Sequence, residues 1–278
     1  MADIFNQMLS RYDIKTKEER LNVTHEIMQQ VCIAGLNRAG FFEKAAFYGD
    51  TCLRIFHKLP RFSEDMDFSL LKPEPDFNLE DYFEVIQNEF LAVGRNISIE
   101  KKEKINDTSI ESVFLKDNTD IVNIRFNTEP TVKIKIEVDK NPPLNFETEY
   151  KLLLLPFSFM TRCFTLPGLF AGKMHALLFR NWRNRVKGRD WYDFEWYIRN
   201  NIPLDFRHFK ERAIQSEGSD FKELTKDQFI QLLQNKFETT KIENVVNDVR
   251  RFILHPQELE IWSKEYFLQL LTFLQFKE

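Results

Sequence analysis

The sequence predicts an α+β protein, in which a mixed β-sheet flanked by helices is followed by a bundle of helices. Two patterns predict this fold class. In Val132–Lys140, apolar and charged residues alternate without a break, as in a strand with one buried face. From Pro167 onward, apolar residues recur almost only at intervals of three or four, which is typical of amphipathic helices. The chain therefore places its strands first and its helices afterwards.

The N-terminal part of the sequence predicts helices that alternate with strands. A short helix is expected at Asp3–Tyr12 and a long one from Lys15 to about Ala39, where Gly40 ends it. The next predicted elements are a buried strand at Ala46–Tyr48, a helix at Asp50–Leu59 with Asp50 or Thr51 as N-cap, a strand at Phe62–Leu71, a helix at Leu79–Ala92, and strands at Ile97–Glu103, Ser109–Leu115, Ile121–Phe126 and Val132–Lys140.

The C-terminal part of the sequence predicts helices alone. They are expected at Gly168–Trp182, Asp190–Arg199, Asp205–Gln215, Thr225–Phe237, Ile242–Ile253 and Trp262–Phe276. A chain of 278 residues is about twice the usual length of a domain. We therefore expect two domains, at residues 1–195 and 196–278, with the boundary somewhere between about 160 and 200.

The composition excludes several classes of protein. Hydrophobic residues make up 43% of the chain, which is enough for a stable core, and few residues are Gly or Pro, so disordered and collagen-like chains are excluded. The three cysteines, Cys32, Cys52 and Cys163, are far apart and form neither a disulfide framework nor a C-x-x-C metal motif. No signal peptide or membrane-spanning run is visible. We expect a cytoplasmic protein with no membrane contact.

The charge is unevenly distributed along the chain. The net charge is −4, yet the stretch from Tyr150 to Arg189 contains eight Lys and Arg and no Asp or Glu. Such a stretch inside an acidic chain suggests a surface that faces phosphate groups. A solvated basic helix end would have the same composition, so the charge alone does not decide between the two.

Two short motifs carry the chemistry. Asp65 and Asp67 are separated by one residue in a predicted strand, so their carboxylates point to the same face. Like charges this close repel each other, so the pair needs a cation between them or a raised pKa. Mg²⁺ prefers such ligands. Upstream, Gly49 opens a predicted helix whose first N–H groups could bind a nucleotide's phosphates. Each motif alone is common, and the solvent face of an edge strand would explain the two acids. The order of the parts is the stronger signal.

Other kinds of site find little support. The five histidines show no metal-ligand spacing, and no P-loop, Rossmann or Gly-x-Ser-x-Gly motif is present. Aromatic residues are frequent between Trp182 and Tyr197, beside the basic stretch. They could stack on bases, but at helical spacing they more often pack in a core.

The two motifs together resemble a known family. The runs Gly49–Arg54 and Arg61–Phe68 resemble the first motif of the AbiEii/AbiGii toxin family of nucleotidyltransferases, in the polymerase-beta-like superfamily, which reads Gly-Gly-Thr-x-Leu-Arg and then Arg-x-Ser-x-Asp-x-Asp. Lys135–Val138 resembles the family's Lys-x-Glu strand. Lys173 and Arg189–Asp193 resemble its lysine helix and the Arg-Asp-x-x-Asp motif after it. The helices beyond these motifs match only loosely.

The resemblance implies a nucleotidyltransferase fold and the transfer of a nucleoside monophosphate from an NTP, with pyrophosphate leaving. In this family the acceptor is often RNA, in several cases the 3′ end of tRNA, and an antitoxin accompanies the toxin. Two alternatives stay open. The chain could bind nucleotide or RNA without turnover, or it could modify a small molecule, as antibiotic nucleotidyltransferases do.

The resemblance also implies roles for individual residues. Asp65 and Asp67 would hold two Mg²⁺ ions with Glu137 as the third carboxylate, although Asp139 shares its face. Lys173 would neutralise the triphosphate, and Asp190 or Asp193 would orient the triphosphate or the acceptor. The candidates for nucleotide binding are Gly49, Asp50, Thr51, Arg54, Arg61, Ser63 and Lys135.

One residue departs from the family pattern. Asp50 stands where the family has a second Gly or Ser. As a carboxylate at a helix N-terminus it would be a good cap. It would also repel an approaching triphosphate unless a cation intervenes. Asp50 therefore bears directly on whether the chain binds NTP.

Overall fold

The computed structural model describes residues 4–101, 119–126, 133–143, 145–180, 186–253 and 255–278. The strand predicted at Ser109–Leu115 lies outside these residues. The chain divides into two compact units, each described separately below. The first contains Met1–Pro142 and Thr148–Cys163, and the second contains Pro143–Glu147 and Phe164–Glu278. The later division lies between Cys163 and Phe164, and the predicted domains 1–195 and 196–278 stay a prediction.

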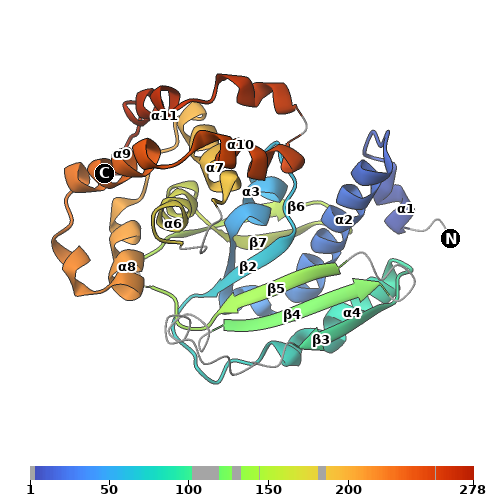
Figure 1. The fold of residues 1–278 in the computed structure, drawn as a ribbon. Helices are drawn as coiled ribbons and strands as arrows, with labels where there is room; N and C mark the ends of the chain where they lie inside the picture. The colour runs from blue at the N-terminus through green and yellow to red at the C-terminus, as the bar shows by residue number, and fades with distance from the viewer. Residues whose placement is uncertain (1–3, 102–118, 127–132, 144, 181–185, 254) are drawn as a thin grey trace. The chain divides into compact units, whose positions relative to one another are not determined.

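The first unit contains a mixed seven-stranded sheet, which confirms the predicted α+β class (Figure 1). The strand order is β3-β4-β5-β2-β1-β7-β6. Strand β2 pairs with β5 in parallel and with β1 in antiparallel orientation. The strands are β1 (Ala45–Tyr48), β2 (Asp65–Leu70), β3 (Ile97–Lys101), β4 (Thr119–Phe126), β5 (Lys133–Asp139), β6 (Thr148–Leu153) and β7 (Phe159–Phe164).

Strand β5 follows its sequence pattern closely. Ile134, Ile136 and Val138 are fully buried, whereas Lys135 and Glu137 on the other face are partly exposed. Because side chains alternate between the two faces of a strand, one face of β5 joins the core and the other is left to polar groups. The face that carries the predicted site is therefore the polar one.

Strands β6 and β7 are missing from the sequence prediction, which treated residues 144–166 as a connection. In β7, Phe159, Thr161 and Cys163 are buried while Met160 is exposed, so a period of two was readable. In β6 two of the three apolar residues are exposed, Tyr150 by 54% and Leu152 by 56%, and only Leu153 at the end of the strand is buried. A pattern search for buried apolar residues finds no such strand.

Helices α1 (Ile4–Leu9), α2 (Lys17–Arg38), α3 (Gly49–His57) and α4 (Phe83–Ala92) complete the first unit, with 3₁₀ turns at Phe41–Glu43 and Leu79–Tyr82. Helix α2 begins with a capping box, in which the side chains of Thr16 and Glu19 each accept a backbone N–H of the other residue. Phe47 of β1 stacks on Phe68 of β2, with their ring centroids 4.8 Å apart. The core beneath the sheet is thus rich in phenylalanine, as the composition suggested.

The second unit is helical. Its helices are α6 (Leu166–Phe179), α7 (Gly188–Arg199), α8 (Phe206–Glu217), α9 (Lys226–Thr239), α10 (Ile242–Val249) and α11 (Lys264–Leu271), with 3₁₀ turns at Ser219–Glu223, Arg250–Phe252 and Pro256–Ile261. Helix α11 is shorter than the predicted Trp262–Phe276, because Ser263 caps its start and turns follow Leu271.

The segment Pro143–Glu147 joins the second unit through side-chain and backbone contacts. Phe146 stacks on Phe164 with a centroid distance of 4.3 Å, and Glu147 forms an ion pair of 2.5 Å with Lys277. The backbone N–H of Thr165 donates to Glu147 O at 3.1 Å. Five residues from the middle of the chain are therefore an integral part of the helical unit.

The aromatic residues of α7 pack in the core of the second unit. Trp191 is 1% exposed, and its ring lies 4.9 Å from that of Phe237 and 4.8 Å from that of Phe267. Core packing, the preferred sequence interpretation, is confirmed over base stacking for this residue. Among the helices that the structure describes, none combines the length and the apolar character needed to span a bilayer.

Candidate active site

A glycine turn joins β1 to α3. Tyr48 occupies the N-cap position of α3, so the N-cap predicted at Asp50 or Thr51 is wrong. Gly49 has a φ of +78°, a region that side chains with a Cβ rarely adopt. A Cβ at Gly49 would also overlap the carboxylate of Asp67. Glycine is needed here because the turn comes into contact with one of the two predicted metal ligands.

The predicted acids lie on one face of two neighbouring strands. In the parallel pairing of β2 with β5, Asp65 is opposite Lys135 and Asp67 is opposite Glu137. Residues opposite each other in a sheet share a face, so the three carboxylates and the lysine form one polar patch. The Lys135 ammonium is in contact with the Glu137 carboxylate. We call Asp65, Asp67, Lys135 and Glu137 the carboxylate face.

The donor chemistry of the carboxylate face fits Mg²⁺. Carboxylate oxygens are the protein ligands that Mg²⁺ prefers, and the glycine turn leaves the space beside Asp67 free of a side chain. Over the described part of the chain, no three His, Cys, Asp or Glu side chains are gathered closely enough to enclose a metal ion. Ligation of Mg²⁺ by Asp65, Asp67 and Glu137 therefore stays a prediction.

Asp50, the residue that departs from the family pattern, is paired with an arginine. Its Oδ2 lies 2.8 Å from a terminal nitrogen of Arg61, whose side chain is 0% exposed. Arg61 also donates to the backbone oxygen of Phe62 at 3.3 Å. The guanidinium of Arg61 thus compensates the charge of Asp50. This compensation weakens the repulsion that Asp50 would otherwise exert on a triphosphate. Asp50 neutralises a buried cation.

We expect Asp50→Asn to destabilise the protein by roughly 3 kcal/mol, because it removes the carboxylate charge that lies 2.8 Å from the fully buried Arg61 guanidinium. The free energy of unfolding in urea measures this effect. Asp13→Asn is the matched control, since it removes the carboxylate of an ion pair of similar length, 3.0 Å to Lys15, in which both side chains are exposed. Equal unfolding midpoints for the two variants would contradict the prediction.

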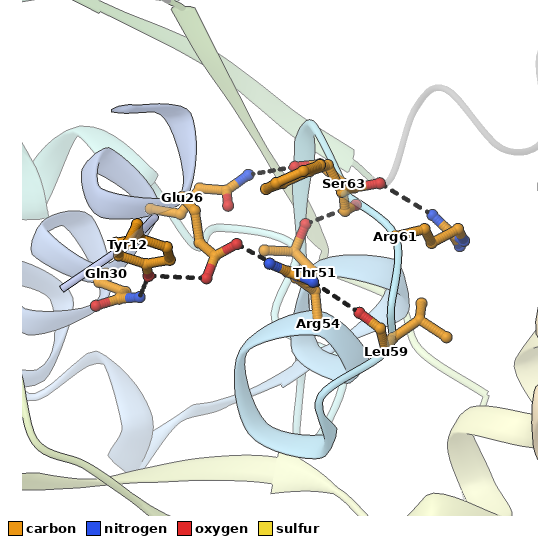
Figure 2. A network of polar contacts seen from close by, with 10 residues as sticks. Tyr12, Glu26, Gln30, Thr51, Arg54, Leu59, Arg61 and Ser63 are labelled. Atoms are coloured by element: carbon orange, nitrogen blue, oxygen red, sulfur yellow. Dashed lines mark hydrogen bonds and ion pairs between the residues drawn. The ribbon is translucent and has the colours of Figure 1, made fainter. Parts of the chain in front are cut away.

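Three other predicted nucleotide-binding side chains are engaged with the protein in a polar network (Figure 2). The Thr51 hydroxyl bonds to Ser63 Oγ at 2.9 Å and to the backbone oxygen of Asp65. Arg54 donates to Glu26 at 2.7 Å and to the backbone oxygen of Leu59 at 3.0 Å. The phosphate or sugar contacts predicted for Thr51, Arg54, Arg61 and Ser63 stay predictions, and the observed contacts hold the loop before β2.

The network extends to the N-terminal helices. Glu26 accepts a hydrogen bond from the hydroxyl of Tyr12 at 2.9 Å, and Gln30 donates to the same hydroxyl at 3.2 Å. Burial, and secondarily the neighbouring Glu26 carboxylate, raises the pKa of Tyr12. Burial lowers the pKa of His25 on the same helix, against the opposing effect of the Glu64 and Asp65 carboxylates.

Sequence reasoning overlooked several polar residues near the site. Glu26 and Gln29 of α2 both bond to elements around the site, yet on a helix they read as ordinary polar positions. Asn123 of β4 lies opposite Lys135, is 3% exposed, and its Oδ1 has no hydrogen-bond partner among the described residues. Its only signal was a strand position where Asn is uncommon.

The three remaining predicted residues form a buried cluster in the second unit. Lys173 of α6 lies 2.9 Å from Asp190 and 2.8 Å from Asp193 of α7, and its side chain is 7% exposed. The two acids are three residues apart, so they share one face of α7. Two carboxylates thus face one ammonium. Burial lowers the pKa of Lys236 in α9, and the Asp190 carboxylate partly opposes this lowering.

Helix α7 is fixed at both ends within the second unit. A Cβ at Gly188 would overlap the backbone of Val245 in α10, and the Gly188 N–H donates to Asp248 at 2.9 Å. Glu195 accepts hydrogen bonds of 2.7 Å from the indole of Trp262 and from the hydroxyl of Tyr266. The acids that hold Lys173 are therefore carried by a well-anchored helix.

The basic stretch Tyr150–Arg189 is not uniformly a surface. Lys173 is buried, and Lys151 is paired with Glu149 at 2.9 Å. Arg189 lies over the ring of Phe252, 4.2 Å from its centroid. A phosphate-facing surface along this stretch stays a prediction.

Comparisons with known proteins identify relatives for most of the chain. Residues 32–272 match the family described as "Nucleotidyl transferase AbiEii toxin, Type IV TA system". MenT4, a nucleotidyltransferase toxin from Mycobacterium tuberculosis H37Rv, is 15% identical with a TM-score of 0.51, and the match covers 98% of each chain. JHP933 from Helicobacter pylori is 17% identical with a TM-score of 0.52, covering 90% of this chain and 88% of that one. At these identities the likeness shows the fold. No curated protein matches the chain.

Proposed function

We propose, because the chain belongs to the AbiEii nucleotidyl transferase toxin family, that it transfers a nucleoside monophosphate from an NTP to RNA, at the 3′ end of tRNA, and that an antitoxin is its protein partner. Nucleotidyl transfer and the toxin class follow from the family. The donor and the acceptor are the proposal, and the basic stretch Tyr150–Arg189 supports an acceptor rich in phosphate.

The parallel register of β2 with β5 is the observation that carries the proposal. It brings Asp67 and Glu137, 70 residues apart in the chain, to opposite positions on one face of the sheet. Gly49 lies against the Asp67 carboxylate and starts α3, whose N-cap residue makes no side-chain hydrogen bond to the helix, and the N-terminal end of a helix favours an anion. In this proposal a cation held by the carboxylate face would lie next to phosphates bound at the start of α3, as nucleotidyl transfer requires.

Asp65, Asp67 and Glu137 would hold Mg²⁺ in this proposal. The ion would supply positive charge to the reacting phosphates and to the leaving pyrophosphate. The protein side chains and backbone of the proposed site would position the NTP. The α3 turn receives phosphate oxygens, and Lys135 stays beside Glu137 as a compensating charge.

We also keep the predicted roles of Lys173, Asp190 and Asp193 as proposals, with a change of emphasis. Because two buried carboxylates already neutralise Lys173, its first role is to hold α6 and α7 together. An effect on the triphosphate or the acceptor would then be exerted through the position of these helices. The experiment that separates the two roles is given in the Discussion.

An unpaired Asp50 carboxylate would favour the non-catalytic alternative, because it would repel a triphosphate. Asp50 is paired with Arg61, which supports the catalytic proposal instead. A small-molecule acceptor stays an outcome of the test below.

We expect the purified protein to transfer label from at least one α-³²P-labelled NTP to total tRNA, with release of pyrophosphate. The four NTPs are tested separately with Mg²⁺ present, and chelation by EDTA is expected to stop the transfer, because the carboxylate face needs a cation. Labelled tRNA is separated on a denaturing gel, and mapping of the labelled end checks the 3′ position.

Aminoglycosides added in competition distinguish the acceptor class. Label on the small molecule rather than on tRNA would replace the RNA acceptor with a small one. Metal-dependent NTP binding without any labelled product, for all four donors and both acceptors, would favour the non-catalytic alternative.

A further inference from the structure

The loop between α3 and β2 ends at Asp65, so its backbone sets the start of the carboxylate face. Gln29 of α2 reaches this loop from 34 residues earlier in the chain. Its amide nitrogen donates to the backbone oxygen of Ser63 at 2.9 Å and to that of Glu64 at 3.1 Å. Both protons of one buried amide are therefore used on the two residues that precede Asp65.

Helix α3 holds the same loop from another direction. The Thr51 hydroxyl bonds to the side chain of Ser63 and to the backbone oxygen of Asp65. At the loop's start, Leu59 O accepts from Arg54, which Glu26 fixes in turn (Figure 2). Arg54 thus holds the start of the loop, and Gln29 and Thr51 hold its end. Helix α2 contributes at both places, directly through Gln29 at the end and indirectly through Glu26 at the start.

The second amide atom of Gln29 indicates what the residue is for. Gln29 is 1% exposed, and its Oε1 has no hydrogen-bond partner in the described part of the chain. The unpaired Oε1 is a buried acceptor, which costs stability. Packing alone would therefore be served about as well by an apolar side chain of the same size as Gln29. The two donated hydrogen bonds account for a polar residue at this position.

We propose that Gln29 is a positioning residue for the transfer proposed above, which fixes the Ser63–Asp65 backbone and through it the direction of the Asp65 carboxylate. This inference rests on the proposed function for its catalytic consequence. Its structural part, the restraint of the loop by one amide, stands independently and is tested by a separate readout.

Gln29→Met is the test and Gln30→Met is the matched control. Both residues are buried glutamines on α2, and the substitution is the same, but Gln30 donates to the Tyr12 hydroxyl instead of the loop. The first readout is amide hydrogen exchange of the peptide that contains residues 59–67, followed by mass spectrometry. Without its two side-chain hydrogen bonds the loop should open more often, and exchange should be about tenfold faster in Gln29→Met.

The second readout is transfer activity with varied Mg²⁺. Loss of a residue that orients a metal ligand typically changes metal affinity or activity about 10- to 100-fold. In Gln29→Met we expect kcat to fall by about that factor and the Mg²⁺ concentration for half-maximal transfer to rise. Thermal unfolding should stay cooperative, with a somewhat lower midpoint because the Ser63 and Glu64 carbonyls lose their hydrogen bonds to Gln29. In Gln30→Met both kinetic values should change much less, because Gln30 reaches the loop indirectly, through Tyr12, Glu26 and Arg54.

Each result decides one part of the inference. Unchanged exchange in Gln29→Met, or equal acceleration in Gln30→Met, would overturn the restraint. Faster exchange with unchanged kcat and Mg²⁺ dependence would overturn the positioning role. If the wild type transfers no nucleotide, the proposed function fails, and the exchange data still decide whether Gln29 restrains the loop.

Discussion

Replacing Asp67 with Asn is expected to lower the rate of nucleotidyl transfer about a thousandfold, which corresponds to about 4 kcal/mol of transition-state stabilisation. Asn has nearly the same shape, but it brings no charge to a bound cation. Asp67 lies at the centre of the carboxylate face, opposite Glu137 and against Gly49. Its side chain is partly exposed, so the free energy of unfolding should change little. Values of kcat/KM with a labelled NTP measure the effect.

Asp139→Asn is the control for this experiment. Asp139 lies on the same face of β5, two residues beyond Glu137 and opposite Ser69, and its Oδ1 accepts the backbone N–H of Asn141 at 3.0 Å. It should keep most of its activity, whereas Glu137→Gln should behave like Asp67→Asn. The reverse result would make Asp139 the third ligand. An active Asp67→Asn variant would remove the basis of the proposed site.

Replacing Lys173 with Met is expected to destabilise the second unit by about 3–5 kcal/mol. The reason is burial, because the change leaves Asp190 and Asp193, 2% and 0% exposed, without the ammonium that lies within 3 Å of both. A loss of that size is a large part of the stability of an ordinary domain. Urea unfolding followed by the fluorescence of the buried Trp191 is a suitable measurement.

A compensating variant and a surface control complete the design. Adding Asp190→Asn and Asp193→Asn to Lys173→Met removes both buried charges that faced the ammonium and should restore much of the stability. Lys222→Met, at an exposed position of the 3₁₀ turn Ser219–Glu223, should unfold like the wild type. A Lys173→Met variant that folds normally but needs far more NTP would show instead that Lys173 serves the triphosphate directly.

The elements that the sequence predicted well are those whose pattern is local. Strand β5 alternates with every core residue apolar, and α2 repeats its apolar positions over 22 residues, so each could be recognised alone. The glycine turn and the two acids of β2 were recognised for the same reason, since Gly49, Asp65 and Asp67 are close in the chain. Strand β6 was not predicted, because its exposed positions Tyr150 and Leu152 carry apolar side chains and the usual alternation is absent.

The features that sequence could not supply are pairings between distant residues. No local pattern fixes the register that sets Asp67 opposite Glu137, because that register depends on how two strands far apart in the chain meet. No local pattern predicts the hydrogen bond from the Gln29 amide to Ser63 either. From the sequence alone Asp50 is expected to repel a triphosphate, whereas in the structure it is the counter-charge of Arg61. Nor does a local pattern reveal the two buried carboxylate partners of Lys173.

The route of the chain through its two units sets a limit on how the protein can be divided. The chain leaves the sheet unit at Pro142, contributes Pro143–Glu147 to the helical unit, returns for β6 and β7, and leaves again after Cys163. A helical fragment cut at residue 164 would lack Phe146 and Glu147, and thus the ring against Phe164 and the acid paired with Lys277. Neither unit is encoded by one continuous stretch of the gene. Recombination at a single point would therefore not transfer one unit intact without the other.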